Sequence, residues 1–307
     1  MNYLSIISPV YKAEAIVDEL VKRIHEEVLK ITVDYEIILV DDGSPDSSWS
    51  KIGENCGRDA KVKGIKLSRN FGQHYAVTAG MAAANGKLIV IMDCDLQDDP
   101  SYISLLIDAY NHGNEIVFTK RIDRKHSFKK RISSWIYNLL FHFFSESRYD
   151  VDAGSLVLFT STVRDVLLKL EDKDRLYVQM LKWVGYKNTY VAVEHKRRFS
   201  GESSYTLLKL IKLAMQGWTS HSARLLKLSV YGGFTLSLIT FLISLVIVVR
   251  YFTEGFLPGW PSLFIAIMFS TGLILISIGI AGIYIGKIFE QSKRRPLFIV
   301  DKKINLD

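Results

Sequence analysis

Short runs of apolar residues, separated by stretches with helical spacing, recur through the first 160 residues. Between the first two runs, Ile16, Leu20, Ile24 and Val28 recur every four residues, the spacing of one helix face. Residues 74–85, rich in Ala, also fit a close-packed helix. Such alternation predicts an α/β fold with a largely parallel sheet and helices on both faces. The predicted strands lie near residues 3–8, 35–40, 63–67, 88–92, 115–119 and 155–159.

Two longer apolar runs, residues 228–249 and 263–285, contain no formally charged residue. As helices, both are long enough to cross a hydrocarbon core of about 30 Å. Gly, Pro and aromatic residues between them suit a short interfacial turn. The alternative is a helical hairpin buried in a soluble protein. We expect two transmembrane helices.

Lys and Arg residues precede the first run and follow the second, which places both ends in the cytoplasm by the positive-inside rule. No signal peptide is expected, because residues 1–10 lack a basic leader and enter a strand pattern directly. The predicted organisation is a cytoplasmic domain (1–204), a juxtamembrane amphipathic helix (205–227), a two-helix transmembrane hairpin (228–286) and a cytoplasmic tail (287–307).

Composition agrees with a membrane-associated protein, since the 307 residues are 49% hydrophobic and carry a formal net charge of +7. The two cysteines, Cys56 and Cys94, match no zinc spacing, and a reducing compartment keeps them as thiols.

The fourth predicted strand runs directly into the acidic sequence D-C-D-L-Q-D-D. Alternation places Asp93, Asp95 and Gln97 on one face of an extended segment, at a strand end where ligands gather in α/β sheets. Carboxylate and amide oxygens suit a hard divalent cation, Mg²⁺ or Mn²⁺. The alternative is a polar turn in which Asp98 and Asp99 cap the next helix.

The second predicted strand also ends in carboxylates. Asp41 or Asp42 can accept hydrogen bonds from a base N–H or a ribose hydroxyl. The alternative is ordinary turn chemistry, with Gly43 at positive φ and Ser44 or Asp46 capping a helix. The first strand leads into P-V-Y-K-A-E rather than G-x-G-x-x-G, which disfavours a dinucleotide cofactor.

Residues 120–144 join a basic segment to an aromatic and aliphatic one. This pattern is typical of an interfacial helix, whose basic residues meet lipid phosphates. A nucleic-acid surface is the rival interpretation of the charges. Trp and Phe residues beside two predicted spans make membrane lipid the better partner, and no nucleic acid is expected.

In order along the chain, S-P-V-Y-K-A-E, D-D-G-S-P-D, L-S-R-N-F-G-Q-H, M-D-C-D-L-Q-D-D-P and R-R-F-S-G-E-S-S-Y resemble the blocks of the family 2 inverting glycosyltransferases of the GT-A fold. The resemblance is to the polyprenyl-phosphate glycosyltransferases, which include dolichol-phosphate mannose synthase and the bactoprenol glucosyltransferases. It covers nearly the whole chain and implies a GT-A, Rossmann-like catalytic domain.

The resemblance also implies roles for residues of this sequence. Asp95, Asp152 and Arg198 would be catalytic, and Asp93, Asp95 and Gln97 would hold the metal. Arg198, Gly201 and Ser203 match a flexible R-x-x-G-x-S loop, although the same charges also fit the positive-inside rule. The acceptor phosphate would be held by Arg121, Arg131 and Ser134. The nucleotide would be bound by Pro9, Tyr11, Glu14, Asp41, Asp42, Arg69, Asp93, Cys94, Asp95, Arg198 and Ser203.

Asp152 has an alternative reading as a capped turn before a strand. The family often has Phe-Arg-Leu after the corresponding Asp-x-Gly, whereas Leu156, Val157 and Leu158 stand here. This departure leaves the sugar contact on that side open.

The resemblance implies transfer of a hexose to undecaprenyl phosphate at the inner membrane, for envelope or O-antigen modification, by a homotetramer. Glucose from UDP-glucose is favoured, with mannose, galactose, N-acetylhexosamine or an aminopentose as alternatives. A processive polysaccharide synthase is less favoured because Q-x-x-R-W is missing. A non-catalytic membrane scaffold is disfavoured by the intact acidic, amide and arginine positions.

Overall fold

The computed structural model describes residues 3–121, 153–194 and 259–306, together with single helical residues and short helical stretches between 226 and 253. The chain divides into two compact units. The first contains Met1–Ser133, Asp150–Ser204 and Arg295–Asp307, and the second contains Ser134–Tyr149 and Tyr205–Arg294.

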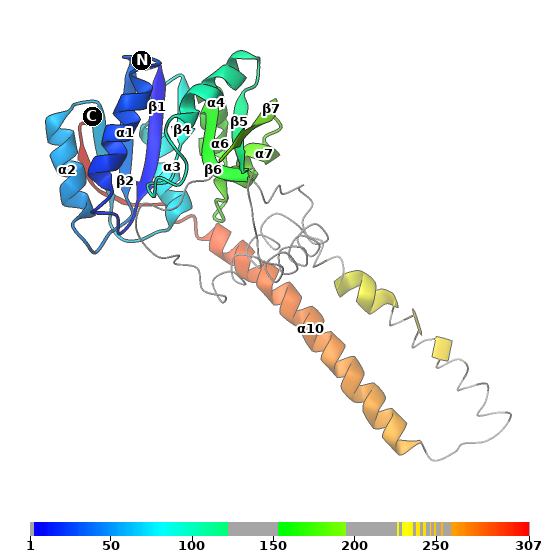
Figure 1. The fold of residues 1–307 in the computed structure, drawn as a ribbon. Helices are drawn as coiled ribbons and strands as arrows, with labels where there is room; N and C mark the ends of the chain where they lie inside the picture. Colours follow the sequence, from blue (N-terminus) through cyan, green and yellow to red (C-terminus); the bar gives the residue numbers. More distant parts are fainter. Residues whose placement is uncertain are drawn as a thin grey trace. The chain divides into compact units, whose positions relative to one another are not determined.

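An eight-stranded sheet with the order β7-β5-β6-β4-β1-β2-β3-β8 forms the centre of the first unit (Figure 1). The strands are β1 (Leu4–Val10), β2 (Tyr35–Asp41), β3 (Val62–Leu67), β4 (Leu88–Ile91), β5 (Ile116–Arg121), β6 (Ala153–Thr160), β7 (Asn188–Val193) and β8 (Val300–Ile304). The helices of this unit are α1 (Val17–Val28), α2 (Ser48–Arg58), α3 (Gln73–Ala83), α4 (Tyr102–Asn111), α6 (Ser161–Lys169) and α7 (Tyr177–Trp183).

The sheet is mostly parallel, as the sequence predicts. Parallel pairing joins β1 to both β2 and β4, β2 to β3, and β5 to β7. Strands β6 and β8 run antiparallel to their neighbours. All six predicted strands are present, with ends that lie within two residues of the prediction.

Helices cover both faces of the sheet. Buried side chains of α1, α2 and α4 form one hydrophobic cluster with the strands, and those of α3, α6 and α7 form a second cluster. In α1 the predicted stripe is confirmed, because Leu20, Ile24 and Val28 are fully buried. Central strands buried on both faces explain their continuous aliphatic runs.

Two edge strands were not predicted. In β7 exposed and half-buried residues alternate, and β8 has three charged residues among five, so neither has a buried aliphatic run. Charged side chains are typical of edge strands, because they discourage pairing with other chains. Residues 287–307 were interpreted as a tail, whereas β8 pairs antiparallel with β3.

Connectivity places a topological switch point between β1 and β4. The chain moves from β1 through β2 to β3 on one side, and then returns through α3 to place β4 on the other side of β1. Ligands of open α/β sheets bind at the carboxyl ends of strands flanking such a point. The carboxyl ends of β1 and β4 lie at one edge of the sheet, which we call the site edge. The end of β5, the start of β6, the end of β7 and the start of β8 lie at this edge too.

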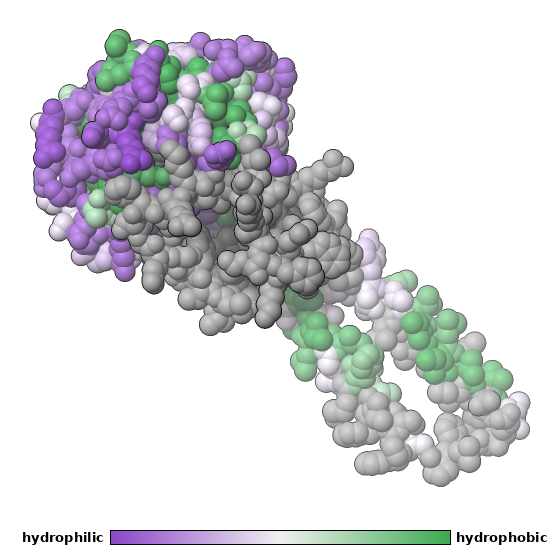
Figure 2. All heavy atoms as spheres, in the orientation of Figure 1, coloured by the Kyte–Doolittle hydropathy of each residue, from purple (hydrophilic) through white to green (hydrophobic). Residues whose placement is uncertain are grey.

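In the second unit, α10 (Trp260–Ser292) includes the predicted span 263–285. Among the described residues, one stretch, Phe269–Ser292, is long and apolar enough to cross a membrane. Its described side chains are largely exposed, and Figure 2 colours the apolar ones green. The described residues between 226 and 253 are helical, but the span 228–249 lies in part outside the described residues and stays a prediction.

Candidate active site

The turn after β4 carries the predicted metal ligands on a constrained backbone. Leu96 has φ of 55°, a left-handed conformation that reverses the chain within the turn. The backbone N–H of Gln97 donates to Asp95 Oδ1 at 3.1 Å, and the side-chain amide of Gln73 donates to Asp93 Oδ1 at 2.6 Å. Both carboxylates therefore have fixed orientations at the carboxyl end of β4.

Cys94, between the two aspartates, is a half-buried free thiol. Burial raises its pKa to about 12, and the negative charges of Asp93 and Asp95 act in the same direction. The backbone of Tyr11 hydrogen-bonds to Cys94, which brings the end of β1 against the turn after β4. Two residues predicted to bind the nucleotide thus lie side by side across the switch point.

The paired aspartates at the end of β2 differ in what they contact. Asp42 accepts hydrogen bonds from the backbone N–H groups of Phe71 and Gly72, at 2.7 and 2.9 Å, through its two carboxylate oxygens. Asp41 accepts one from Ser44 N–H at 3.2 Å, and its Oδ2 has no hydrogen-bond partner among the described residues. Burial raises the pKa of both carboxyl groups.

This difference assigns the two aspartates different uses. Asp42 holds the loop before α3 through these two hydrogen bonds, a contact that its local sequence does not predict. Asp41 Oδ2 is a buried acceptor with no hydrogen-bond partner among the described residues, and the predicted contact with a base N–H or a ribose hydroxyl stays a prediction.

Glu14 also contributes to loop structure. Its carboxylate accepts from Ser47 N–H at 2.9 Å, just before α2, and its own N–H donates to Asp46 at 3.4 Å. Nearby, Ala13 N–H donates to Ser48 Oγ at 2.9 Å. These hydrogen bonds join the loop after β1 to the loop after β2. They fix the conformation of Glu14, which is predicted to contact the nucleotide.

Arg69 lies on the loop after β3 and is exposed. Its guanidinium carbon stands 4.3 Å from the centre of the Phe71 ring. Gly43, with φ of 65°, packs so closely that a Cβ there would lie 2.5 Å from the Arg69 carbonyl carbon. Only glycine fits this contact, which keeps the Arg69 loop beside the end of β2.

Asp98 and Asp99 have separate roles. Asp99 accepts from Ser101 N–H at 3.0 Å in the turn before α4, whose N-cap is Ser101, so it stabilises the turn without capping the helix. Asp98 is buried, and its carboxylate accepts from Ser155 Oγ at 2.8 Å, tying the acidic turn to β6. Gln73 and Ser155 were both missed, because they are distant in sequence from the residues that they support.

Several predicted site residues cannot be placed. Arg131, Ser134, Asp152, Arg198 and Ser203 lie outside the described residues, as does the side chain of Arg121, whose backbone ends β5 at the site edge. Their roles stay predictions. Pro9 is described, and it lies buried in β1.

The described residues near the acidic turn suit a divalent cation by donor type. Asp93, Asp95 and Gln97 supply carboxylate and amide oxygens, and none is fully buried. Within the described part of the chain, no group of three or more His, Cys, Asp or Glu residues could hold a metal ion. Mg²⁺ in proteins typically keeps several waters and takes further ligands from substrate phosphates.

Comparison with known families decides the class of this site. Residues 5–165 match the model of glycosyl transferase family 2, just over half of the chain. The chain belongs to this family. It is therefore a glycosyltransferase, and the resemblance noted in the sequence is confirmed.

Relatives of this glycosyltransferase align along nearly its whole length. It is 36% identical to an uncharacterized glycosyltransferase, YkcC of Bacillus subtilis, over 99% of this chain and 94% of that protein. It is 31% identical to the bactoprenol glucosyl transferase of Shigella phage SfV, over 97% of each chain.

Among solved structures, mannosyl-3-phosphoglycerate synthase from Rubrobacter xylanophilus overlaps 70% of this chain and 71% of that one, with a TM-score of 0.51 and 15% identity. This likeness supports the GT-A-like α/β fold alone.

Proposed function

We propose that this glycosyltransferase moves a hexose, with glucose from UDP-glucose favoured, onto undecaprenyl phosphate with inversion at the anomeric carbon. The observation that carries the proposal is the alignment with the bactoprenol glucosyl transferase over 97% of each chain, which includes the segment after the family domain. A relative that shares only the sugar-nucleotide domain would say nothing of the acceptor.

The proposed reaction needs little base catalysis. A phosphate monoester is ionised near neutral pH, so one of its oxygens can attack the anomeric carbon directly. The bond from that carbon to the nucleoside diphosphate breaks as the new C–O bond forms, and the electron pair leaves with UDP. A single displacement inverts the anomeric centre, which turns an α-linked donor into a β-linked lipid product.

Departure of UDP is the step that the described site is built to assist. Asp93, Asp95 and Gln97 would hold Mg²⁺ or Mn²⁺, which when bound supplies positive charge beside the pyrophosphate. The side chain of Gln73 orients the Asp93 carboxylate, and the backbone N–H of Gln97 orients the Asp95 carboxylate, before any ligand binds. A preoriented charge costs no reorganisation during the reaction.

The remaining described residues suit the nucleotide. Asp41 offers a buried acceptor oxygen at the end of β2, and Arg69 offers an exposed guanidinium on the neighbouring loop. A planar guanidinium pairs well with phosphate oxygens.

Two observations support a membrane acceptor. The apolar helix α10 and the bactoprenol-related relatives favour membrane association. We place the catalytic domain on the cytoplasmic face of the inner membrane.

A donor panel tests the proposal. Purified protein in detergent receives undecaprenyl phosphate, Mg²⁺ and one labelled donor: UDP-glucose, UDP-galactose, UDP-N-acetylglucosamine or GDP-mannose. Label in the lipid phase from UDP-glucose alone supports the proposal in full. Label from another donor keeps the acceptor and corrects the sugar. No lipid label from any donor contradicts the proposed acceptor.

A further inference from the structure

The last residues of the chain pack against the domain that binds the donor. Residues 295–306, the C-terminal strap, begin just after α10 ends at Ser292 and belong to the first unit. Within the strap, β8 pairs antiparallel with β3. Phe298, Val300 and Leu306 pack against the hydrophobic cluster that includes Leu67, the last residue of β3.

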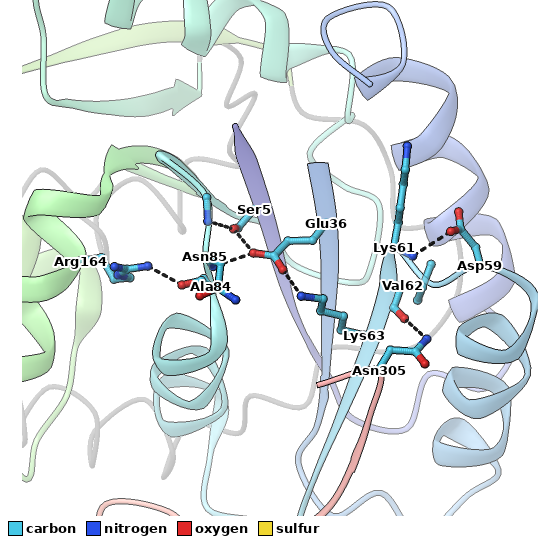
Figure 3. Close-up of polar contacts among 11 residues, drawn as sticks. Ser5, Glu36, Asp59, Lys61, Val62, Lys63, Ala84, Asn85, Arg164 and Asn305 are labelled. Carbon is cyan, nitrogen blue, oxygen red and sulfur yellow. Dashed lines mark hydrogen bonds and ion pairs between the residues drawn. The ribbon is translucent and has the colours of Figure 1, made fainter. Parts of the chain in front are cut away.

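Polar contacts fix the strap at both ends and in its middle. At its start, Lys173 donates a side-chain hydrogen bond to the carbonyl of Arg295. In its middle, Ser68 N–H donates to the carbonyl of Ile299 at 2.9 Å. At its end, the Asn305 side chain donates to the carbonyls of Cys56 and Val62, each at 2.8 Å (Figure 3 draws the bond to Val62).

The hydrogen bond between Ser68 N–H and the Ile299 carbonyl lies at the loop that we propose binds the sugar nucleotide. Ser68 immediately precedes Arg69, on the loop that Asp42 holds through Phe71 and Gly72. Gly43 packs against the same loop from the β2 side. The loop is therefore held from two directions, by the turn after β2 and by the strap.

We propose that the C-terminal strap is a positioning element for the donor, which holds the Ser68–Arg69 loop so that the guanidinium of Arg69 meets the nucleotide phosphates. This inference rests on the proposed function, because it needs a sugar nucleotide at this edge of the sheet. The strap touches no reacting atom, so loosening it should weaken donor binding more than it slows turnover.

Asn305 offers a mild way to loosen the strap. Its φ is 57°, a conformation that glycine adopts without strain. Asn305→Gly therefore removes two hydrogen bonds and leaves the backbone path available. A chain that ends at residue 297 removes most of the strap and should show a larger effect in the same direction.

A matched control lies at the amino ends of the strands, whereas the Arg69 loop lies at their carboxyl ends. Ser5 Oγ donates to Glu36 at 2.5 Å and accepts from Gly86 N–H at 2.7 Å, near the amino ends of the strands (Figure 3). Ser5→Ala thus loses buried hydrogen bonds far from the Arg69 loop. The Ser5→Ala variant therefore measures how much a general loss of stability changes nucleotide affinity.

The test compares wild type, Asn305→Gly and Ser5→Ala in the full-length protein in detergent. The measurements are the affinity for UDP, and for GDP, with Mg²⁺, the KM for the donor, kcat, and amide hydrogen exchange of residues 68–72 without nucleotide. For Asn305→Gly we expect affinity about tenfold weaker, or about 1.4 kcal/mol, a raised KM, a nearly unchanged kcat and faster exchange. Ser5→Ala should melt earlier but bind as wild type.

Unchanged nucleotide affinity in Asn305→Gly would overturn the inference, as would an equal loss in Ser5→Ala. If the wild type itself binds neither nucleotide, the proposed function fails and the role of the strap fails with it. These outcomes are distinct, because the first two leave wild-type binding intact.

Discussion

The side-chain amide of Gln73 donates a hydrogen bond to Asp93, with 2.6 Å between Nε2 and Oδ1. Gln73 is the first residue of α3, and Asp93 follows β4, so the bond joins two elements that both reach the site edge. Its effect is to fix the orientation of a proposed metal ligand.

Replacing Gln73 by Ala should therefore weaken the metal site without removing a ligand. Losses of such supporting partners typically cost 10–100-fold in metal affinity or activity, and we expect about tenfold here. The measurement is the Mg²⁺ concentration that gives half-maximal transfer. An unchanged Mg²⁺ requirement would show that the Asp93 orientation does not depend on this bond.

Glu36, which is buried, and Lys63, which is half-buried, form an ion pair whose loss should affect stability alone. Glu36 is fully buried, with Oε2 2.5 Å from Lys63 Nζ, and its other oxygen accepts from Ser5 and from the N–H of Asn85 (Figure 3). Glu36→Ala leaves the Ser5 hydroxyl, the Asn85 N–H and the half-buried Lys63 ammonium without this partner, so we expect unfolding to cost about 2 kcal/mol less.

Thermal melting in detergent checks this expectation, with Glu36→Gln as the milder control. The network lies near the amino ends of the strands, so the KM for the donor should not change in protein that remains folded. A raised KM would place the network in the site rather than in the scaffold.

His74 predicts a specific dependence of stability on pH. Burial lowers its pKa from 6.5 to about 4, and its ring packs 5.4 Å from that of Tyr177. Between pH 4 and 6.5 the unfolded chain binds more protons at this residue than the folded chain. The contribution to stability is therefore complete above pH 6.5 and is lost as the pH falls towards 4.

The check is to melt wild type and His74→Phe at pH 7 and pH 5. The wild type should lose more stability than the variant, by up to about 1.4 kcal/mol for each pH unit. Equal losses in the two proteins would contradict a buried neutral imidazole.

Sequence patterns predicted the parts of the fold that depend on burial. The central strands are aliphatic because both of their faces are covered, and this signal is local. Strand β8 gives no such signal, because three of its five residues are charged and it pairs with β3, which is distant in sequence.

In the candidate site, too, features that depend on local sequence could be predicted and contacts between distant segments could not. The positions of Asp93 and Asp95 after β4, and of Asp41 at the end of β2, could be predicted from the aliphatic runs before them, and their roles stay predictions. The use of Asp42 for the Phe71 and Gly72 amides, and of Gln73 for Asp93, could not, because each bond joins segments 20 to 30 residues apart.

Metal-dependent transfer to the lipid tests the central claim most directly. Wild type, Asp95→Asn and the surface control Asp34→Asn are compared for label moved from UDP-glucose to undecaprenyl phosphate, with Mg²⁺ or with a chelator. We predict lipid label for wild type and Asp34→Asn only with Mg²⁺, and a loss of at least ~100-fold for folded Asp95→Asn. Full activity of purified Asp95→Asn, or transfer in the presence of the chelator, would contradict the account.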